Sequence, residues 1–490
     1  MAKKATVIGA GIGGLASAAL LAKDGWNVTV LEKNSQVGGR ARIWEEKGFR
    51  FDMGPSWYLM PEVFERFFES FGKKREDFYK LHKLDPSYKV YFSPNDALEM
   101  SSDLEKTLKV FESFEEGGAE RLRKYLNQAR YKYEVAMREF LYRNYSTIFD
   151  FFNRRLMTEG LRLNIFSRLD RFVRAYFTDR RARQLLEYAM VFLGTSPVAA
   201  PALYSIMAHV DMNLGVFYPE GGLAGVGQAI ARLAESVGVE IRLDHEVKRI
   251  DTEGGKAKRV FTEHGLFESD IVVVNADYAH SETQLLAPRY QSFPSSYWSR
   301  KVFAPSMFIL YIGLKRKLKD LEHHNLYFAS DWEKHFDKIF KNPDWPEKPC
   351  FYISCIAKTD KAAAPPGGEN VFVLVPVAPG LDDNDSQRES YADHVISHVE
   401  EITGENLHED VALKRIYSHR DFSADYNAYR GTALGLSHTL LQTAVFRPSI
   451  KSRRAQNLYY VGQYTHPGVG VPMVIISAQV AANLINGEHR

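Results

Sequence analysis

A glycine-rich turn near the N-terminus has the residue types and spacing that bind a dinucleotide phosphate. Gly9, Gly11 and Gly14 follow a short apolar run, and a helical pattern begins directly after them. In such a turn the first glycine permits a tight bend, the second lets a pyrophosphate approach the backbone, and the third lets the helix pack closely on the strand. Glu32 stands at the end of the next apolar run, where a carboxylate accepts hydrogen bonds from ribose hydroxyls.

A second glycine pair, Gly38 and Gly39, comes shortly after Glu32 and is followed by Arg40. Nicotinamide-binding domains do not need this extension. It resembles the FAD signature of the superfamily of amine oxidases and carotenoid desaturases, in which the glycine pair and the arginine pass beside the pyrophosphate and the ribityl chain. A plain loop turn is the alternative interpretation.

The C-terminal part of the chain carries a second mark of a flavin site. An apolar run at 457–461 leads into a glycine, and a long apolar helical segment begins at 471. The residues expected to contact the cofactor here are Gly462, Gln463, Gly470, Val471, Pro472 and Met473. A helix N-terminus at this point can direct its positive end toward the N1 and C2 carbonyl edge of a flavin and stabilise the reduced anion.

Three longer segments, 51–65, 215–241 and 457–485, extend the resemblance over essentially the whole chain. In this order and spacing they resemble the bacterial-type phytoene desaturases, and the C-terminal segment is the most specific. The resemblance adds to the expected cofactor contacts Gly13, Lys33, Pro55, Ser56, Val247 and Asn275. Gln463 stands where many superfamily members carry Asp or Glu.

Acid–base candidates are few. His466, just before the segment expected to face the flavin, is the one histidine placed near the chemistry, and a loop histidine that shapes the turn is the alternative. Asp52 is the second candidate, and a carboxylate that holds the Gly54–Pro55 turn is its alternative. Neither a Ser/His/Asp set nor a metal-ligand cluster has a recognisable spacing, so no metal is expected.

Two further patterns bear on the redox chemistry. Cys350 and Cys355 are predicted to lie on opposite faces of one strand, which favours inert thiols over a redox pair. No cysteine lies near the C-terminal flavin segment, so the FAD is expected to be noncovalent. A second nucleotide turn is missing, because 222–227 has the wrong spacing. Electrons are therefore expected to pass from substrate to flavin and on to oxygen or a quinone.

Composition narrows the class of protein. The 490 residues include 63 Lys and Arg against 61 Asp and Glu, and the net charge of +2 gives no support to a nucleic-acid partner. Hydrophobic residues make up 45% of the chain, which is ordinary globular composition. The first residues run directly into a strand pattern instead of a signal peptide, so the expected location is the cytoplasm.

The expected fold is α/β plus α+β, because strand, turn and helix patterns recur at both ends and in the middle of the chain. We predict a discontinuous Rossmann-like FAD-binding domain, an inserted substrate domain with an antiparallel sheet, and a helical insertion. The FAD-binding domain is expected at 1–75, 215–282 and 430–490. The substrate domain is expected at 76–115 and 283–429, and the helical, membrane-associating insertion at 116–214.

Membrane contact is expected in the helical insertion. Residues 154–183 contain nine arginines against three carboxylates, and an apolar face follows helical spacing beside Arg168, Arg171 and Arg174. That apolar face consists of Ile165, Phe166, Leu169, Phe172, Val173, Tyr176 and Phe177. A surface helix docked on the protein's own core is the alternative. The uncharged stretch 188–210 contains helix breakers and is predicted to form two short buried helices beside something apolar.

The resemblance implies an FAD-dependent desaturase that adds double bonds to phytoene or a related acyclic carotenoid by hydride transfer to flavin N5. A desaturase of a hydroxylated or C30 carotenoid is the alternative within this class. A non-catalytic isoprenoid-binding protein on the same scaffold is the alternative from another class. Because a C40 polyene is almost insoluble in water, the protein is expected to associate peripherally with the inner face of the cell membrane.

Overall fold

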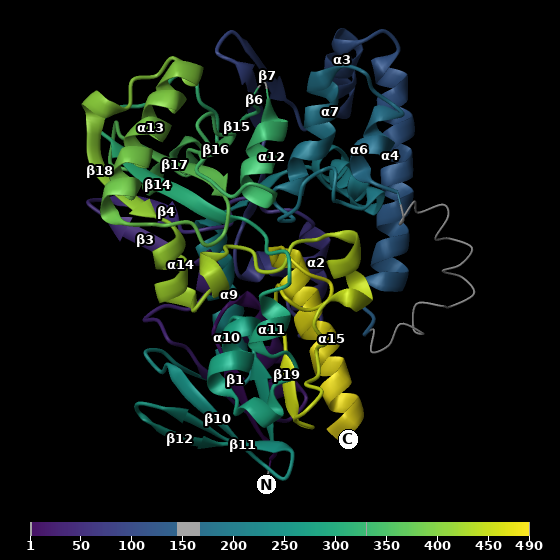
Figure 1. Cartoon of the computed structure of the whole chain (residues 1–490), viewed down its shortest axis with the longest axis vertical. Helices are drawn as coiled ribbons and strands as arrows, with labels where there is room; N and C mark the ends of the chain where they lie inside the picture. The colour runs from purple at the N-terminus through teal and green to yellow at the C-terminus, as the bar shows by residue number, and fades with distance from the viewer. Residues whose placement is uncertain (1, 145–166, 330, 490) are drawn as a thin grey trace.

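The computed structural model describes residues 2–144, 167–329 and 331–489, shown in Figure 1. Its lower half is built on a five-stranded parallel sheet in the order β19-β13-β1-β2-β9, and both termini lie at this end. The strands are β1 (Lys4–Ile8), β2 (Asn27–Leu31), β9 (Glu240–Arg242), β13 (Ile271–Val274) and β19 (Leu458–Tyr460). Segments from the start, the middle and the end of the chain therefore form one Rossmann-like sheet.

Helix α1 (Ile12–Lys23) lies at the centre of this half. It contacts both α9 (Gly222–Ser236) and α15 (Val471–His489). Its residues from Ile12 to Leu21 are all buried, so the helix is apolar on every side instead of amphipathic. This burial fixes the N-terminus of α1 beside the ends of β1 and β13.

The upper half contains a seven-stranded sheet in the order β18-β14-β17-β16-β15-β6-β7. Its strands are β6 (Tyr88–Ser93), β7 (Asp96–Met100), β14 (Ser306–Leu314), β15 (His324–Tyr327), β16 (Phe351–Ser354), β17 (Glu369–Val377) and β18 (Val411–Tyr417). All neighbours pair antiparallel except β15 and β6, which pair in parallel. The expected antiparallel sheet is thus confirmed with one parallel joint.

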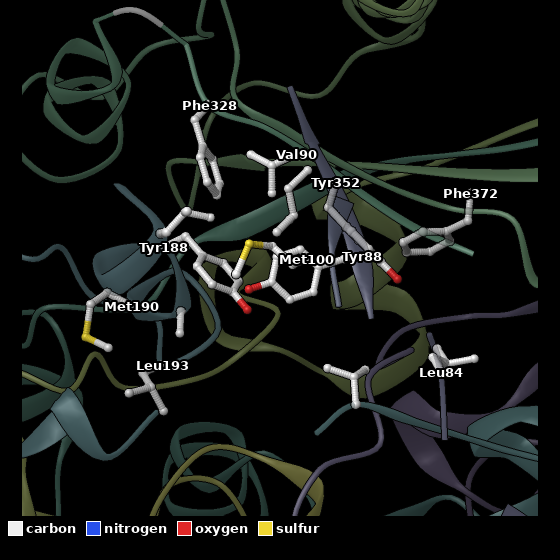
Figure 2. Close-up of a cluster of buried hydrophobic side chains, with 14 of the residues drawn as sticks. Leu84, Tyr88, Val90, Met100, Tyr188, Met190, Leu193, Phe328, Tyr352 and Phe372 are labelled. Carbon is white, nitrogen blue, oxygen red and sulfur yellow. The ribbon is translucent and has the colours of Figure 1, made fainter. Parts of the chain in front are cut away.

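All nine residues of β14 are buried because both faces of this sheet are covered. Phe308, Leu310 and Ile312 face the cluster that includes α13 (Asp385–Thr403). Met307 and Ile309 point to the opposite face and a second cluster, as the period of two in a strand requires. Figure 2 shows part of this second cluster, where Tyr352 and Phe372 of the sheet lie in one group with Tyr188.

Smaller elements complete the fold. A three-stranded sheet contains β10 (Val247–Glu253), β11 (Lys256–Thr262) and β12 (Gly265–Glu268). The two-stranded pairs are β3 (Ile43–Glu46) with β4 (Phe49–Asp52), and β5 (Leu81–Lys83) with β8 (Phe217–Pro219). The remaining helices are α2 (Pro61–Glu69), α3 (Leu104–Phe114), α4 (Gly118–Val135), α6 (Leu169–Arg174), α7 (Arg180–Glu187), α8 (Ile206–His209), α10 (Tyr278–His280), α11 (Ser295–Trp298), α12 (Trp332–Phe340) and α14 (His419–Tyr426).

The helix predicted to lie on a membrane is placed differently by the structure. Ile165 and Phe166 fall outside the described residues. Helix α6 is only six residues long and contains three members of the predicted face, Leu169, Phe172 and Val173. Leu169, Val173 and Phe177 are buried in the protein core, and Phe172 and Tyr176 pack against that core. The docked-helix alternative is therefore the correct one for this segment, because its apolar side already has a protein partner.

The uncharged stretch 188–210 was predicted to form two short buried helices, and the structure replaces the first of them by a 3-10 turn. Two 3-10 turns, Tyr188–Met190 and Ala202–Ser205, are followed by α8. No helix among the described residues has the combination of length and apolar character needed to cross a bilayer.

Candidate functional site

The glycine turn lies between β1 and α1, as the spacing predicts. A Cβ on Gly14 would lie 2.1 Å from the carbonyl oxygen of Gly9, so only glycine permits this approach of helix to turn. Asn275, at the end of β13, donates its side-chain Nδ2–H to the same carbonyl at 3.5 Å. The ends of two neighbouring parallel strands thus meet at the N-terminus of α1.

The second glycine pair lies directly against this turn. Gly38 donates its N–H to the Ala10 carbonyl at 2.8 Å, and Gly38 and Gly11 form a parallel bridge. Arg40 follows, with its guanidinium 4.9 Å from the ring centre of Tyr426 in α14. The segment is itself a tight turn, in which the Ala41 N–H donates to the Gly38 carbonyl at 3.1 Å, and it holds Arg40 next to the glycine turn of β1 and α1.

Arg40 has buried donors without a partner. Its Nε and one terminal nitrogen are buried, and neither has a hydrogen-bond partner among the described residues. Buried guanidinium donors are normally satisfied, and Arg is suited to bidentate binding of phosphate or carboxylate. Since Arg40 also lines the cavity described below, this side chain fits an anionic group of a bound ligand.

Glu32 is held in place by backbone donors. Its Oε2 accepts the Ala10 N–H at 2.7 Å, and its Oε1 accepts the N–H and side-chain Nδ2–H of Asn34 at 2.8 and 2.9 Å. A carboxylate has about four lone-pair sites, so capacity remains for hydroxyl donors of a ribose. The ammonium of Lys33 lies 3.5 Å from the carboxylate of Glu246.

The C-terminal segment is fixed by a buried arginine. Arg447 donates to the carbonyls of Gln463, Tyr464 and Thr465 between β19 and α15. Burial lowers the pKa of Arg447 to about 10, so the group remains charged at neutral pH. The segment enters α15, whose first residues line the cavity. The positive end of a 19-residue helix is thereby placed at the cavity wall.

One cavity of about 510 Å³ joins these parts to the seven-stranded sheet. At one end it is lined by the glycine turn, Glu32 and Arg40. At the other end the walls are apolar and come from β14, β17, the end of α4 and the stretch 188–210. Members of this apolar wall are Met307, Ile309, Leu374, Tyr133, Phe140, Val191, Phe192, Leu193, Leu203 and Met207. The prediction that 188–210 lines something apolar is confirmed.

The model of the flavin containing amine oxidoreductase family matches residues 12–486. The chain belongs to this family. It is 44% identical to the carotenoid 3,4-desaturase of Haloarcula japonica, over 98% of this chain and 97% of the relative. It is 35% identical to the zeta-carotene-forming phytoene desaturase of Myxococcus xanthus, over 99% and 95% of the two chains. A 4,4'-diapophytoene desaturase of Staphylococcus haemolyticus is 34% identical over 97% of both.

Solved structures agree on the fold of this chain. An oxidoreductase from Methanosarcina mazei matches with a TM-score of 0.65 and 18% identity, over 97% of this chain and 98% of the other. Wild-type putrescine oxidase bound to putrescine matches with a TM-score of 0.62 and 13% identity, over 99% of both chains. Family membership implies a flavin cofactor, and the unpartnered donors of Arg40 fit its anionic part.

Most residues predicted from the sequence line the cavity. They are Gly9, Gly11, Gly13, Glu32, Lys33, Gly38, Gly39, Arg40, Pro55, Ser56, Val247, Asn275, Gly462, Gln463, His466, Gly470, Val471, Pro472 and Met473. Gly14 lies behind the turn, where it packs α1 on Gly9.

Asp52 lies outside the cavity lining. Its carboxylate accepts the N–H groups of Leu223 and Ala224 at 3.2 and 3.1 Å, at the start of α9. Burial raises the pKa of Asp52 to about 6. The prediction of an acid–base role for Asp52 is therefore corrected, because its carboxylate anchors the N-terminus of α9. The alternative, a carboxylate that holds the Gly54–Pro55 turn, does not describe these contacts either.

His466 lines the cavity as a neutral imidazole. Burial lowers its pKa to about 4, and its Nε2–H donates to the Phe140 carbonyl at 3.1 Å. The ring thus links the segment before α15 to the end of the helical part. Since it is uncharged at neutral pH, His466 can shape the wall or accept a proton only transiently.

The cavity residues that the sequence did not mark include Asp277 and His438. Asp277 follows β13 and accepts the hydroxyl of Tyr464 at 2.6 Å. Burial raises its pKa, while the charge of Arg40 opposes that shift. His438 accepts the Val469 N–H at 3.2 Å through Nε2. The strand end before Asp277 was a usable signal, whereas nothing in the pattern around His438 marks it.

The structure also shows the surroundings of the two cysteines and of the possible metal ligands. Cys350 is partly buried and Cys355 is buried, and burial raises the pKa of Cys350 to about 12. Both thiols are therefore protonated and unreactive at neutral pH. Among the described residues, no group of His, Cys, Asp and Glu could hold a metal ion.

Proposed function

We propose that this chain is an FAD-dependent desaturase of an acyclic carotenoid. The observation that carries the proposal is one continuous cavity, which runs from the glycine-rich loops to an apolar wall. The curated relatives with 44%, 35% and 34% identity are named as carotenoid desaturases along nearly their full length, which supports it. The cofactor is proposed to be noncovalent FAD, because both cysteines lie in or next to the seven-stranded sheet, away from the flavin segment.

Bound flavin would accept a hydride from the allylic carbon of the substrate. The chain's own residues would bind the cofactor and orient it against the substrate. Arg40 would pair with the pyrophosphate, Glu32 would accept ribose hydroxyls, and the first turn of α15 would stabilise negative charge on the flavin. The apolar walls exclude water from the reacting carbons, and loss of a proton from the adjacent carbon completes each new double bond.

The identity of the carotenoid substrate is the finer part of the proposal. Phytoene is one candidate substrate. The relative named carotenoid 3,4-desaturase has 44% identity, against 35% for the relative named phytoene desaturase, which favours a later carotenoid with an extended conjugated system. A non-catalytic isoprenoid-binding role is disfavoured, because Arg40 and Glu32 are both in position at the cavity.

Reconstituted protein tests the proposal. After incubation with FAD and a quinone, phytoene and a conjugated acyclic carotenoid with a saturated 3,4 bond are supplied in parallel. Chromatography should show a product with one more double bond and a red-shifted absorbance from the second substrate. If neither carotenoid gives a product, the desaturase assignment is refuted. Acid precipitation should release all yellow colour, and flavin left in the pellet would refute noncovalent binding.

Electron transfer and location follow from the substrate. Oxygen or a quinone is the proposed electron acceptor, and NADPH is not expected to bleach the flavin anaerobically. Because a C40 polyene partitions into lipid, the protein is proposed to work at the inner face of the cell membrane as a peripheral protein.

A further inference from the structure

Three large apolar side chains are exposed in one place. Leu441 is 73% exposed, and Phe446 and Val302 are each 45% exposed. Only three other large hydrophobic residues are exposed among those that the structure describes, namely Tyr131, Val198 and Leu266. Single exposed apolar residues are normal on soluble proteins, but a group of them marks an interaction site.

Hydrogen bonds hold this group together. The buried side chain of Gln442 accepts the Val302 N–H at 3.0 Å and donates to the Val302 carbonyl at 2.7 Å. Leu441 is the neighbour of Gln442, and two contacting 3-10 turns, Leu440–Gln442 and Ala444–Phe446, carry the two exposed side chains of the loop. The exposed side chains therefore stand on a fixed loop and not on a frayed end.

The same loop forms part of the cavity wall. Thr443 and Ala444 lie between the two exposed residues and line the cavity. The hydroxyl of Thr443 is hydrogen bonded at 2.7 Å to that of Tyr204, another lining residue. A short loop thus connects the apolar surface directly to the apolar interior.

The surroundings are free of carboxylates in the sequence. Residues 283–319 and 426–487 contain no Asp or Glu, and these two segments supply all three exposed side chains. Arg300 and Lys301 stand next to Val302. Arg300 donates to the Ser296 carbonyl at 2.9 Å and the Lys301 ammonium lies 4.6 Å from the ring centre of Tyr297, but neither forms an ion pair with a carboxylate among the described residues. By contrast, Arg168 and Arg174 in the helical part pair with Asp170 and Glu333.

We infer that Val302, Leu441 and Phe446, together with Arg300 and Lys301, form a docking patch for an anionic lipid surface beside the cavity. Apolar side chains enter the acyl boundary while unpaired cations contact the headgroups. A second copy of the chain fits less well, because a stable dimer buries about 800 Å² on each partner and three side chains supply far less. The inference rests on the proposed function in one respect, namely that a lipid-soluble carotenoid substrate requires the protein to contact a membrane.

The patch is tested by flotation of the FAD-loaded protein with vesicles of phosphatidylglycerol and phosphatidylcholine. Arg300→Gln with Lys301→Gln should weaken binding about 25-fold, which corresponds to about 1 kcal/mol per cation. Leu441→Ser with Phe446→Ser should weaken it more than tenfold. Leu266→Ser, an exposed apolar residue on β12, and Arg168→Gln with Arg174→Gln are matched controls that should float like the parent.

Several outcomes would overturn the inference. They are a parent protein that does not float, patch variants that float like the parent, and controls that lose binding equally. A dimer in light scattering that dissociates in the Leu441→Ser, Phe446→Ser variant would show that the patch joins two copies instead. The flavin content of every variant should equal that of the parent, which excludes misfolding as the cause.

Turnover separates this inference from the proposed function. If both are correct, the patch variants desaturate carotenoid in detergent micelles like the parent and lose activity only with vesicles. If the protein does not act on carotenoids, turnover is absent in both forms, but flotation still reports on the patch.

Discussion

Arg40 should act in opposite directions on the free and the flavin-bound protein. Two of its buried nitrogens have no partner among the described residues, and each buried unsatisfied donor costs about 1–3 kcal/mol. Arg40→Met keeps an apolar stem against Tyr426 and removes these donors. We therefore expect the flavin-free variant to unfold with a free energy about 1–2 kcal/mol higher than the flavin-free parent.

With FAD the sign reverses. Two charge-assisted hydrogen bonds of about 1.5 kcal/mol each correspond to a roughly 100-fold weaker Kd when they are lost. FAD at 100 times the parent's Kd stabilises the parent by about 2.7 kcal/mol, but would stabilise the variant by only about 0.4 kcal/mol. Flavin fluorescence titration gives the Kd, and urea unfolding with and without FAD gives both free energies.

Arg42 offers a matched control for this experiment. It pairs with Asp425 and also lies over Tyr426, but it does not line the cavity. Arg42→Met should lower the stability of the free and bound forms equally and leave the Kd unchanged. If Arg40→Met binds FAD like the parent, or destabilises the flavin-free protein, the reasoning about an unpartnered buried cation is refuted.

Three more predictions follow from single contacts. Gly14→Ala forces a Cβ to 2.1 Å from the Gly9 carbonyl and should abolish FAD retention on gel filtration, whereas Gly487→Ala, with open space around it, should retain it. His438→Ala leaves the Val469 N–H without its acceptor and should weaken the FAD Kd about tenfold in titration, and His438→Gln should restore part of it. Burial raises the pKa of Glu187 to about 8, so the free energy of unfolding falls as the pH rises from about 4.5 to 8. Glu187→Gln should flatten this fall and raise the free energy of unfolding by about 3 kcal/mol at pH 7. Urea unfolding across this pH range measures the effect, and an unchanged pH profile would contradict the prediction.

The glycine turn and the position of Glu32 beside it could be predicted from the sequence, because close backbone contact restricts the residue types at these positions. At Gly14 no side chain fits, and at Glu32 the carboxylate must follow the end of β2 to reach the turn. Such constraints are local and keep a fixed spacing, so they are visible in one sequence.

The substrate wall could not be predicted residue by residue. Met307 and Leu374 come from different strands, and Phe192 comes from a turn, with no spacing that relates them. An apolar wall accepts many side chains of similar volume, so no residue type is required at any one position. The pattern reports that a segment is apolar, and only the fold decides which side meets the cavity.

Asp52 and the helix at 169–174 failed for a related reason. Whether a buried carboxylate anchors a helix or moves a proton depends on its partners, and those of Asp52 are backbone groups about 170 residues away in the sequence. The period of an amphipathic helix gives its apolar side but not the nature of what covers it. Leu169 and Val173 face protein, although the same period would also suit a lipid surface.

A long C-terminal segment without carboxylates contributes to both the cavity and the proposed docking patch. Residues 426–487 contain no Asp or Glu, and this segment includes both the cavity-lining start of α15 and the loop with Leu441 and Phe446. A dinucleotide carries negative phosphates, and an anionic lipid surface carries negative headgroups, so a carboxylate near either would oppose binding. If both proposals hold, repulsion between carboxylates and phosphates is one cause for the absence of acidic side chains from the proposed membrane contact to the proposed cofactor site.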